Sequence, residues 1–311
     1  MNLLKKILIL ITLSQLFACG SNNSKVLDTP TSGEINIIAD ESYAPLLDAE
    51  LASFQSAYKN AKINIKYLPE EYAIRAFLQD SSRLIFITRE LNKDELKYFS
   101  TRQITARTLH IATDGVTFIT NPSNPDSLLT LNQIKDIMSG KITKWSEINK
   151  QNSNNSIVIT FDQDNGSNLR YAKENLKLNL ENKNLFVSGS NKNVIDYVAK
   201  HKDAIGIIGM NWVSDRDDTT MLSFLKKIKV VGVSKYDNPN DESEYFQPYQ
   251  AYVAQNFYPL TRKLYVISRE PRNGLGTGFA AYLAGDKGQR IVLKSGLYPA
   301  TAPIRLINFK R

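Results

Sequence analysis

Sulfur and imidazole chemistry are almost absent from this chain of 311 residues, which has one cysteine and two histidines. Because the cysteine is Cys19, the residues after it hold no thiol for a disulfide, a nucleophile or a thiolate metal site. His110 and His201 lie far apart and form no H-E-x-x-H pattern, and the chain has no G-x-S-x-G elbow or P-loop. We therefore expect a protein that is not an enzyme and that binds no metal or cofactor.

Glycine and proline are sparse, and no repeat or low-complexity stretch appears. With 42% hydrophobic and 23% charged residues, the chain has the composition of a soluble globular protein, long enough for two domains. The formal net charge of +8 is scattered, with no basic tract or aromatic-basic interleaving. This pattern argues against nucleic-acid binding and indicates a solvated surface that attracts anions weakly.

The longest apolar run near the N-terminus, residues 7–16, is too short to cross a bilayer as a permanent helix. Two lysines precede it, and the sequence L-F-A-C that ends at Cys19 resembles a bacterial lipobox, whose cysteine is lipidated. The alternative is a plain secretory signal with an incidental cysteine. We expect a lipoprotein signal peptide over 1–19, a flexible tether over 20–33, and a lipid anchor that holds the protein at the periplasmic side of a membrane in the cell envelope.

Apolar periodicity predicts strands that alternate with helices. In the first part we expect strands at 33–39, 62–68 and 83–88, helices at about 43–58 and 70–79, and a strand over 105–120 broken by Asp114 and Gly115. Further on we expect strands at 157–161, 204–208, 228–234 and 304–309, and helices at 131–139, from 167, at 191–201, at 248–255 and at 276–294 with a break near 285. We expect the segment 258–268 to return to the first domain. Such βαβ steps favour parallel sheets.

The domain prediction is an α/β fold with two lobes. Lobe I comprises residues 34–117 and 256–311, and lobe II comprises residues 118–255. Two crossings of the chain join the lobes and leave a cleft in which a ligand would be enclosed.

The segment 157–170 combines a strand, a turn-rich loop and a helix that begins near Ser167. The first N–H groups of a helix lack partners and lie at the positive end of its dipole, so a small anion can dock there. Gly166 ends the turn-rich loop, Ser167 and Asn168 add short side-chain donors, and Arg170 can bind an oxyanion with two hydrogen bonds. The alternative is that Ser167 only caps an ordinary helix.

Two other strand ends carry similar groups. Asp40, Glu41, Ser42 and Tyr43 separate the first strand from a helix with Pro45 in its first turn, and Thr88 with Arg89 follows the third strand. Ligand sites in α/β sheets lie at these carboxyl ends. For Arg89, a surface salt bridge with a neighbour such as Glu90 is the alternative.

Several motifs resemble one family. Residues 131–145, L-N-Q-I-K-D-I-M-S-G-K-I-T-K-W, resemble a signature of PstS-like phosphate-binding proteins of ABC transporters. Further likenesses are at 110–124, at 204–209 (A-I-G-I-I-G), at 258–262 (Y-P-L-T-R) and at 288–299, so the resemblance covers nearly all of residues 34–309. It implies a type II periplasmic-binding fold, with two lobes that close on a phosphate dianion held without metal, and a monomer that delivers its ligand to ABC permease subunits.

By this resemblance the ligand-binding residues are Asp40, Glu41, Ser42, Tyr43, Thr88, Arg89, Gly166, Ser167, Asn168 and Arg170. The chain departs from the family in its first loop, which is commonly rich in Gly, Ser and Thr but here carries two acids. It also departs in the second lobe, where G-S-N-L-R replaces a G-S-G-T-R type of turn.

The acids of the first loop have two interpretations. Asp40 or Glu41 can accept the hydroxyl proton of a phosphate dianion, a proton that sulfate lacks. Alternatively, both acids complement a helix N-terminus. We expect a lipid-anchored binding protein that captures phosphate or a related oxyanion for an ABC importer, with a PstS-like envelope sensor or adaptor that no longer binds phosphate tightly as the alternative.

Overall fold

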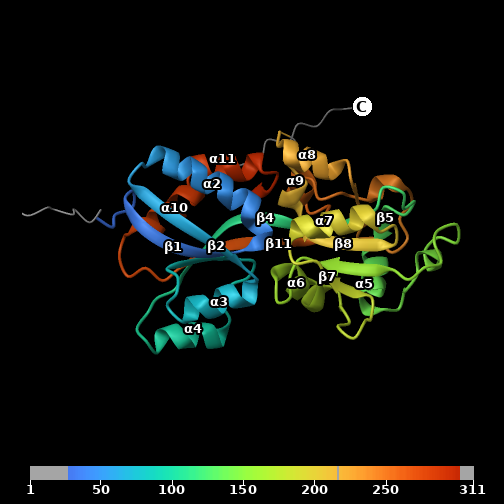
Figure 1. The fold of residues 1–311 in the computed structure, drawn as a ribbon, viewed down its shortest axis with the longest axis horizontal. Coiled ribbons are helices and arrows are strands. Elements are labelled where there is room, and N and C mark those ends of the chain that lie inside the picture. The colour runs from blue at the N-terminus through green and yellow to red at the C-terminus, as the bar shows by residue number, and fades with distance from the viewer. Residues whose placement is uncertain (1–26, 216, 302–311) are drawn as a thin grey trace, which may run out of the picture.

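A computed structural model describes residues 27–215 and 217–301 and has an α/β architecture with two lobes. Its main sheet has the order β2-β1-β3-β11-β4-β8-β6-β7, and β9 and β12 pair with β4 beside this path. Figure 1 shows the lobes side by side, with β4 passing from one into the other.

Lobe I is built on a mixed sheet with helices on both faces: β1, β2 and β3 are parallel, and β11 and β12 pair antiparallel with their neighbours. It contains β1 (Gly33–Asp40), β2 (Ala61–Leu68), β3 (Leu84–Ile87), β11 (Thr261–Ser268) and β12 (Tyr298–Pro299). Helices α2 (Ala44–Ala57), α10 (Leu275–Ala284) and α11 (Asp286–Lys294) lie on one face, and α3 (Glu70–Leu78) and α4 (Lys93–Ser100) on the other (Figure 1). Ile35 and Ile37 of β1 therefore belong to one apolar cluster and Ile38 to another.

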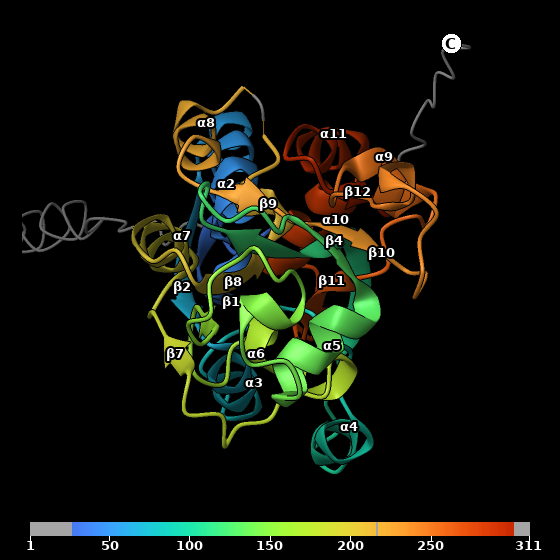
Figure 2. The ribbon, with the colours of Figure 1, turned by 90° about the vertical axis from the view of Figure 1, so that its right-hand side faces the viewer.

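Lobe II repeats this plan. Its sheet contains β6 (Val158–Phe161), β7 (Leu185–Val187), β8 (Ala204–Gly209) and β9 (Lys229–Val230), and a separate pair joins β5 (Leu128–Thr130) to β10 (Gly232–Ser234). Helices α7 (Asn191–Lys200) and α8 (Thr219–Leu225) lie on one side, and α5 (Leu131–Ser139) and α6 (Ser167–Asn175) on the other (Figure 2). The short α9 (Gln250–Ala254) precedes the return to lobe I.

Strand β4 (Arg107–Thr120) is shared by both lobes. Its residues up to Gly115 pair with β11, and those from Val116 onward pair with β8. The predicted break at Asp114 and Gly115 is wrong, because the strand runs through both residues and changes its partner there. Asp114 is fully buried and its carboxylate makes polar contacts. A Cβ on Gly115 would lie 2.9 Å from Cβ of Pro248, so this position requires glycine because the chain is closely packed there, and not because the chain turns.

Two other expectations need correction. The single strand expected at 228–234 is two short strands, β9 and β10, which pair with β4 and β5. Residues 27–33, which were expected to belong to a flexible tether, pack on lobe I: Asp28 pairs with Arg83 at 2.5 Å and accepts a hydrogen bond from the Leu275 amide.

The expected signal peptide with Cys19 and the strand expected at 304–309 lie outside the described residues. Within 27–215 and 217–301, no helix is both long enough and apolar enough to span a bilayer.

Candidate functional site

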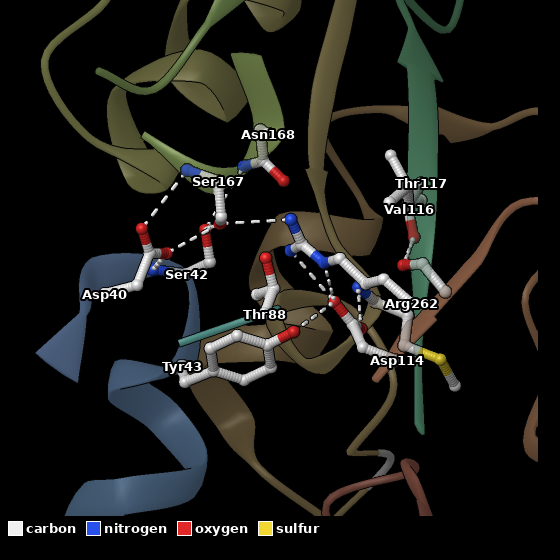
Figure 3. Close-up of polar contacts among 12 residues, drawn as sticks. Asp40, Ser42, Tyr43, Thr88, Asp114, Val116, Thr117, Ser167, Asn168 and Arg262 are labelled. Atoms are coloured by element: carbon white, nitrogen blue, oxygen red, sulfur yellow. Dashed lines mark hydrogen bonds and ion pairs between the residues drawn. The ribbon is translucent and has the colours of Figure 1, made fainter. Parts of the chain in front are cut away.

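The end of β1 meets the beginning of α6 where the two lobes touch (Figure 3). Asp40 is 1% exposed, and its Oδ1 accepts hydrogen bonds from the Ser42 amide at 3.0 Å and from Ser167 Oγ at 2.8 Å. Its Oδ2 accepts a third hydrogen bond from the Ser167 amide at 3.2 Å. A carboxylate from lobe I therefore occupies the helix N-terminus that the sequence predicts as a docking point for a small anion.

We call this contact between the lobes the seam. It comprises Asp40, Glu41 and Ser42 of lobe I and Asp162, Ser167, Asn168 and Asn191 of lobe II. Ser42 Oγ lies 3.2 Å from Ser167 Oγ, and Asn168 Nδ2 donates to Ser42 Oγ at 3.3 Å. Asn191, at the start of α7, donates from Nδ2 to Glu41 at 2.5 Å and to Asp162 at 3.2 Å. The structure thus brings Asp40, Glu41, Ser42, Ser167 and Asn168 together, while Gly166 stands directly before α6 as its N-cap.

A buried ion pair forms the floor of the seam. Arg262 donates from Nε to Asp114 at 2.9 Å and from Nη1 to Ser167 Oγ at 3.0 Å (Figure 3). Tyr43 donates its hydroxyl to the same Asp114 carboxylate at 3.2 Å. Sequence reasoning missed Arg262 and Asp114 as site residues, although both lie in motifs that carry the family resemblance, 258–262 and 110–124.

Thr88 and Arg170 meet on a different carboxylate, Glu70 of α3, which sequence reasoning also missed. Glu70 accepts from Thr88 Oγ1 at 2.7 Å and from Arg170 Nε at 2.5 Å. Arg170 also donates to Glu174, one turn along α6. Arg170 also donates from Nη2 to Thr88 Oγ1 at 2.6 Å, and this contact joins the lobes a second time.

Arg89 forms a two-pronged ion pair with Glu95, at 2.8 and 2.7 Å. Glu90, the neighbour suggested by the sequence, contributes only its backbone carbonyl, which accepts a hydrogen bond from Arg89 at 2.8 Å. Glu95 is the ion-pair partner of Arg89 because it belongs to the capping box with Asn92, which fixes the Glu95 side chain at the start of α4, next to Arg89.

Beside the seam lies a cavity of about 590 Å³, which we call the interlobe cavity. Lobe I supplies Arg89, Arg262 and Lys263 to its lining, and lobe II supplies Arg170 and Tyr171. The predicted site residues therefore fall into two groups. Asp40, Glu41, Ser42, Tyr43, Ser167 and Asn168 lie in the seam or on its floor, whereas Thr88, Arg89 and Arg170 line the cavity.

Burial shifts the proton affinities of the seam acids. It raises the pKa of Asp162 to about 7, with the nearby Asp40 and Glu41 carboxylates acting in the same direction. Burial also raises the pKa of Asp40 and that of Glu41 above the ordinary range. At Glu70 the effect of burial is outweighed by Arg170, so its pKa is lowered. Burial thus raises the pKa of the seam acids, whereas the pKa of Glu70, in the neighbouring contact with Arg170, is lowered.

The seam also contains buried polar atoms that have no hydrogen-bond partner. Asp162 Oδ1 and Asn168 Oδ1 are buried without a hydrogen-bond partner, although both side chains point into the seam network. A proton on Asp162 would supply a donor for one of these acceptors. Among residues 27–215 and 217–301, no group of three or more His, Cys, Asp or Glu side chains is placed to hold a metal ion.

Comparison with known proteins adds the following. A family model described as "PBP superfamily domain" matches residues 25–287. The sequence is similar to phosphate-binding protein PstS of Staphylococcus epidermidis, with 22% identity over 274 residues, 87% of this chain and 79% of the relative. PstS of Staphylococcus aureus is 22% identical over 276 residues, 88% of this chain and 80% of the relative.

Solved structures with a similar fold include a substrate-binding protein with bound phosphate from Clostridium perfringens, with a TM-score of 0.72 and 23% identity over 86% of this chain and 100% of that one. An ABC-type phosphate transport receptor from Vibrio cholerae has a TM-score of 0.64 and 17% identity, with the same coverage of 86% and 100%. These names describe binding and transport proteins rather than enzymes.

Proposed function

The chain belongs to the PBP superfamily, and from that premise we propose that it is a solute-binding protein that captures phosphate or a related oxyanion for an ABC importer. The relatives from both Staphylococcus species carry the name phosphate-binding protein, and the match extends over most of their length. We propose that lobe I comprises 34–117 with 256–311, that lobe II comprises 118–255, and that the ligand is enclosed between them.

The observation that carries this proposal is the charge of the interlobe cavity. Four cationic side chains from both lobes line it, those of Arg89, Arg170, Arg262 and Lys263, against a single acidic lining residue, Glu90. Three of these cations form ion pairs with Glu95, Glu70 and Asp114, and Lys263 is the fourth. A small anion that touches both lobes would favour their closure.

The remaining features of the proposal rest on the sequence. We propose that Cys19 carries a lipid that anchors the protein at the extracytoplasmic face of a membrane, and that the partners are permease subunits of an ABC importer. Replacement of Cys19 by serine should abolish incorporation of labelled palmitate. Persistent labelling of the Cys19→Ser protein would contradict the anchor.

A second candidate function, that of an envelope sensor or adaptor, is favoured by one observation. The predicted anion donors are already bonded to the chain's own carboxylates: Ser167 to Asp40, Thr88 and Arg170 to Glu70, and Arg89 to Glu95. An external anion must compete with these internal ones. An adaptor would keep the closed form permanently and bind no anion tightly.

Titration calorimetry on the purified chain separates the two functions. An importer component should bind phosphate, arsenate, sulfate or molybdate with a measurable heat, and Arg170→Gln should weaken that binding about tenfold or more, because a charge-assisted contact is lost. Arg290→Gln, on the exposed face of α11, serves as the control and should change nothing. Absence of binding for all four anions would contradict the importer and support the adaptor.

A further inference from the structure

Lobe I contains a second cavity, of about 680 Å³, at its end away from lobe II. We call it the distal pocket, and four arginines line it: Arg83, Arg107, Arg269 and Arg272. Arg83 directly precedes β3, Arg107 begins β4, and Arg269 directly follows β11. Arg262, on the floor of the seam, is at the other end of β11, roughly 23 Å from Arg269 at about 3.3 Å per residue. The distal pocket is therefore separate from the site between the lobes.

The shape of the distal pocket does not depend on closure of the lobes. Every lining residue belongs either to lobe I or to the segment 27–33 that packs on it. The pocket is thus present whether the lobes are open or closed, with or without a ligand between them.

The acids of the distal pocket already have partners. They are Asp28, Asp80 and Glu270. Asp28 and Glu270 accept hydrogen bonds from the first amides of α10, at 3.0 and 3.1 Å, so the positive end of the helix dipole compensates part of their charge. Arg83 pairs with Asp28 at 2.5 Å, and Arg269 pairs with Asp80 at 3.1 Å.

Two arginines of the pocket remain for a ligand. Arg107 and Arg272 are exposed, and neither forms an ion pair in the part of the chain that the structure describes. A guanidinium group binds phosphate oxygens through paired hydrogen bonds in a fixed geometry. A phosphate group in the distal pocket would meet two such groups.

The rest of the lining indicates what the phosphate is attached to. The volume of about 680 Å³ falls within the range of roughly 300 to 1,000 Å³ that is typical of sites for small organic molecules. The lining has only two apolar side chains, those of Ile104 and Pro271. The pocket therefore suits a polar group such as a glycerophosphate, and offers little surface to a ring or a hydrocarbon chain.

The beginning of the described chain lies beside this pocket, at the end of lobe I away from lobe II (Figure 1). Asp28 lines the pocket, and Leu27, directly before it, is 78% exposed. Ser32 Oγ donates to the Leu27 carbonyl at 2.6 Å and helps to fix this position. Leu27 is eight residues after Cys19, and eight fully extended residues span at most about 29 Å. A lipid on Cys19 would therefore hold the distal pocket within roughly 30 Å of the bilayer surface.

From these features we propose that the distal pocket binds the phosphate of an anionic phospholipid headgroup in the membrane that carries the anchor. Arg107 and Arg272 hold the phosphate, the exposed Leu27 contacts the interface, and the acyl chains stay in the bilayer. The tether keeps lipid phosphates at a high effective concentration, so a weak contact is enough to orient lobe I toward the membrane. This inference rests on the proposed anchor at Cys19 and is independent of anion capture between the lobes.

Modification of arginines by phenylglyoxal tests the inference. The full chain is extracted from cell membranes in detergent and reconstituted into vesicles of phosphatidylcholine alone or of phosphatidylcholine with an equal amount of phosphatidylglycerol. Mass spectrometry of peptides gives the rate at each arginine. We expect Arg107 and Arg272 to react about fivefold more slowly in the vesicles that contain phosphatidylglycerol. Arg290, exposed on α11, is the control within the same molecules and should react at one rate in both.

A substitution links the protection to this pocket. In Arg107→Gln the phosphate loses one of its two guanidinium partners, so the protection of Arg272 should fall below about twofold. Arg290→Gln is the matched control variant and should keep the full protection of Arg272. Thermal unfolding of both variants shows whether the fold is intact.

The outcomes separate this inference from the proposed anchor. Equal rates at Arg107 and Arg272 in both vesicle types, in a protein that floats with both, would overturn the inference and leave the anchor intact. A protein that floats with neither would overturn both. Equal protection by inorganic phosphate added to phosphatidylcholine vesicles would overturn the assignment to a lipid and point to a free anion. Protection of Arg272 that persists in a folded Arg107→Gln protein would overturn the assignment to this pocket.

Discussion

At the scale of single residues, the pair formed by Arg262 and Asp114 is the most deeply buried ion pair among the residues that the structure describes. Both side chains are nearly inaccessible, at 3% and 0% exposed. Arg262→Met would leave the Asp114 charge buried without a partner, and we expect the free energy of unfolding to fall by roughly 3 to 5 kcal/mol. Urea denaturation followed by circular dichroism measures the change.

The control for this experiment is Arg290→Met, which breaks an exposed pair with Asp286 one turn away on α11. Such surface pairs contribute about 0.5 kcal/mol or less. Equal losses in the two variants would mean that burial does not govern the cost, contrary to our expectation.

Glu50 on α2 is a buried acid that no proposed function uses. It is 0% exposed, both carboxyl oxygens lack partners, and burial raises its pKa to about 9. Between its ordinary pKa of 4.5 and this value the folded state holds a proton that the unfolded state releases, so stability falls as pH rises through that window. The fall should be up to about 1.4 kcal/mol per pH unit.

Unfolding midpoints at pH 5, 7 and 9 test this dependence. Glu50→Gln cannot release a proton and should flatten the decline relative to the parent protein. Glu71→Gln, at an exposed position on α3, should keep the parent slope. If the stability of Glu50→Gln fell with pH as steeply as that of the parent protein, a group other than Glu50 would cause the pH dependence.

Sequence reasoning at this scale succeeds where a signal is local. Ser42 and Ser167 stand at the beginnings of helical segments, and that position alone indicates groups near a strand end. It could not predict that Asp40 bonds to Ser167, because the two residues are 127 positions apart and meet only when the lobes are assembled. For the same reason the sequence could not predict Glu70 as the partner of Arg170.

At the scale of elements, α10 depends on the absence of a side chain at Gly278. A Cβ there would collide with the backbone carbonyl of Pro30, so the segment before β1 can lie against the helix only because this residue is glycine. Gly278→Ala should lower stability by roughly 1 to 3 kcal/mol, although alanine is the better helix former. Thermal unfolding measures the loss.

Gly285→Ala provides the comparison for this substitution. At Gly285 the nearest atoms to a Cβ are 3.3 and 3.4 Å away, and φ is −80°, a value that alanine adopts readily. We expect a much smaller change there. If Gly278→Ala unfolds at the parent temperature, the contact between 30 and α10 contributes nothing to stability.

Element boundaries were predictable where the sequence carries a start and a stop. Helix α5 begins at a capping box formed by Thr130 and Gln133 and ends at Gly140, which adopts φ of 80°. The division of 228–234 into β9 and β10 was not predictable, since it depends on which strand each piece meets. Short strands such as β7 carry too few residues for a periodic signal.

At the scale of the whole molecule, closure of the two lobes should depend on pH. In the closed form Asp162 has a pKa of about 7, whereas contact with water would return it to its ordinary value of 3.8. The closed form therefore binds the proton more tightly, and closure weakens as pH rises from about 4 to 7 and then levels off. Asp40 and Glu41, which face Asp162, act in the same direction, and Arg262 opposes them.

Small-angle X-ray scattering at pH 5 and pH 8 measures this effect as a larger radius of gyration at pH 8. Asp162→Asn should reduce the difference, because an amide carries no charge at either pH. Asp164→Asn, at an exposed position on the same loop, should leave it unchanged. A radius of gyration that is equal at both pH values in the parent protein would contradict the predicted proton linkage.

The path of β4 through both lobes has a mechanical consequence. A flexible loop between two lobes would place little restriction on their rotation. Strand β4, in contrast, is held by strand-to-strand hydrogen bonds, to β11 on the side of lobe I and to β8 on the side of lobe II. Rotation of one lobe against the other must twist this ladder, and a twisted ladder exerts a restoring torque. We therefore expect the crossing to resist large rotations of one lobe against the other.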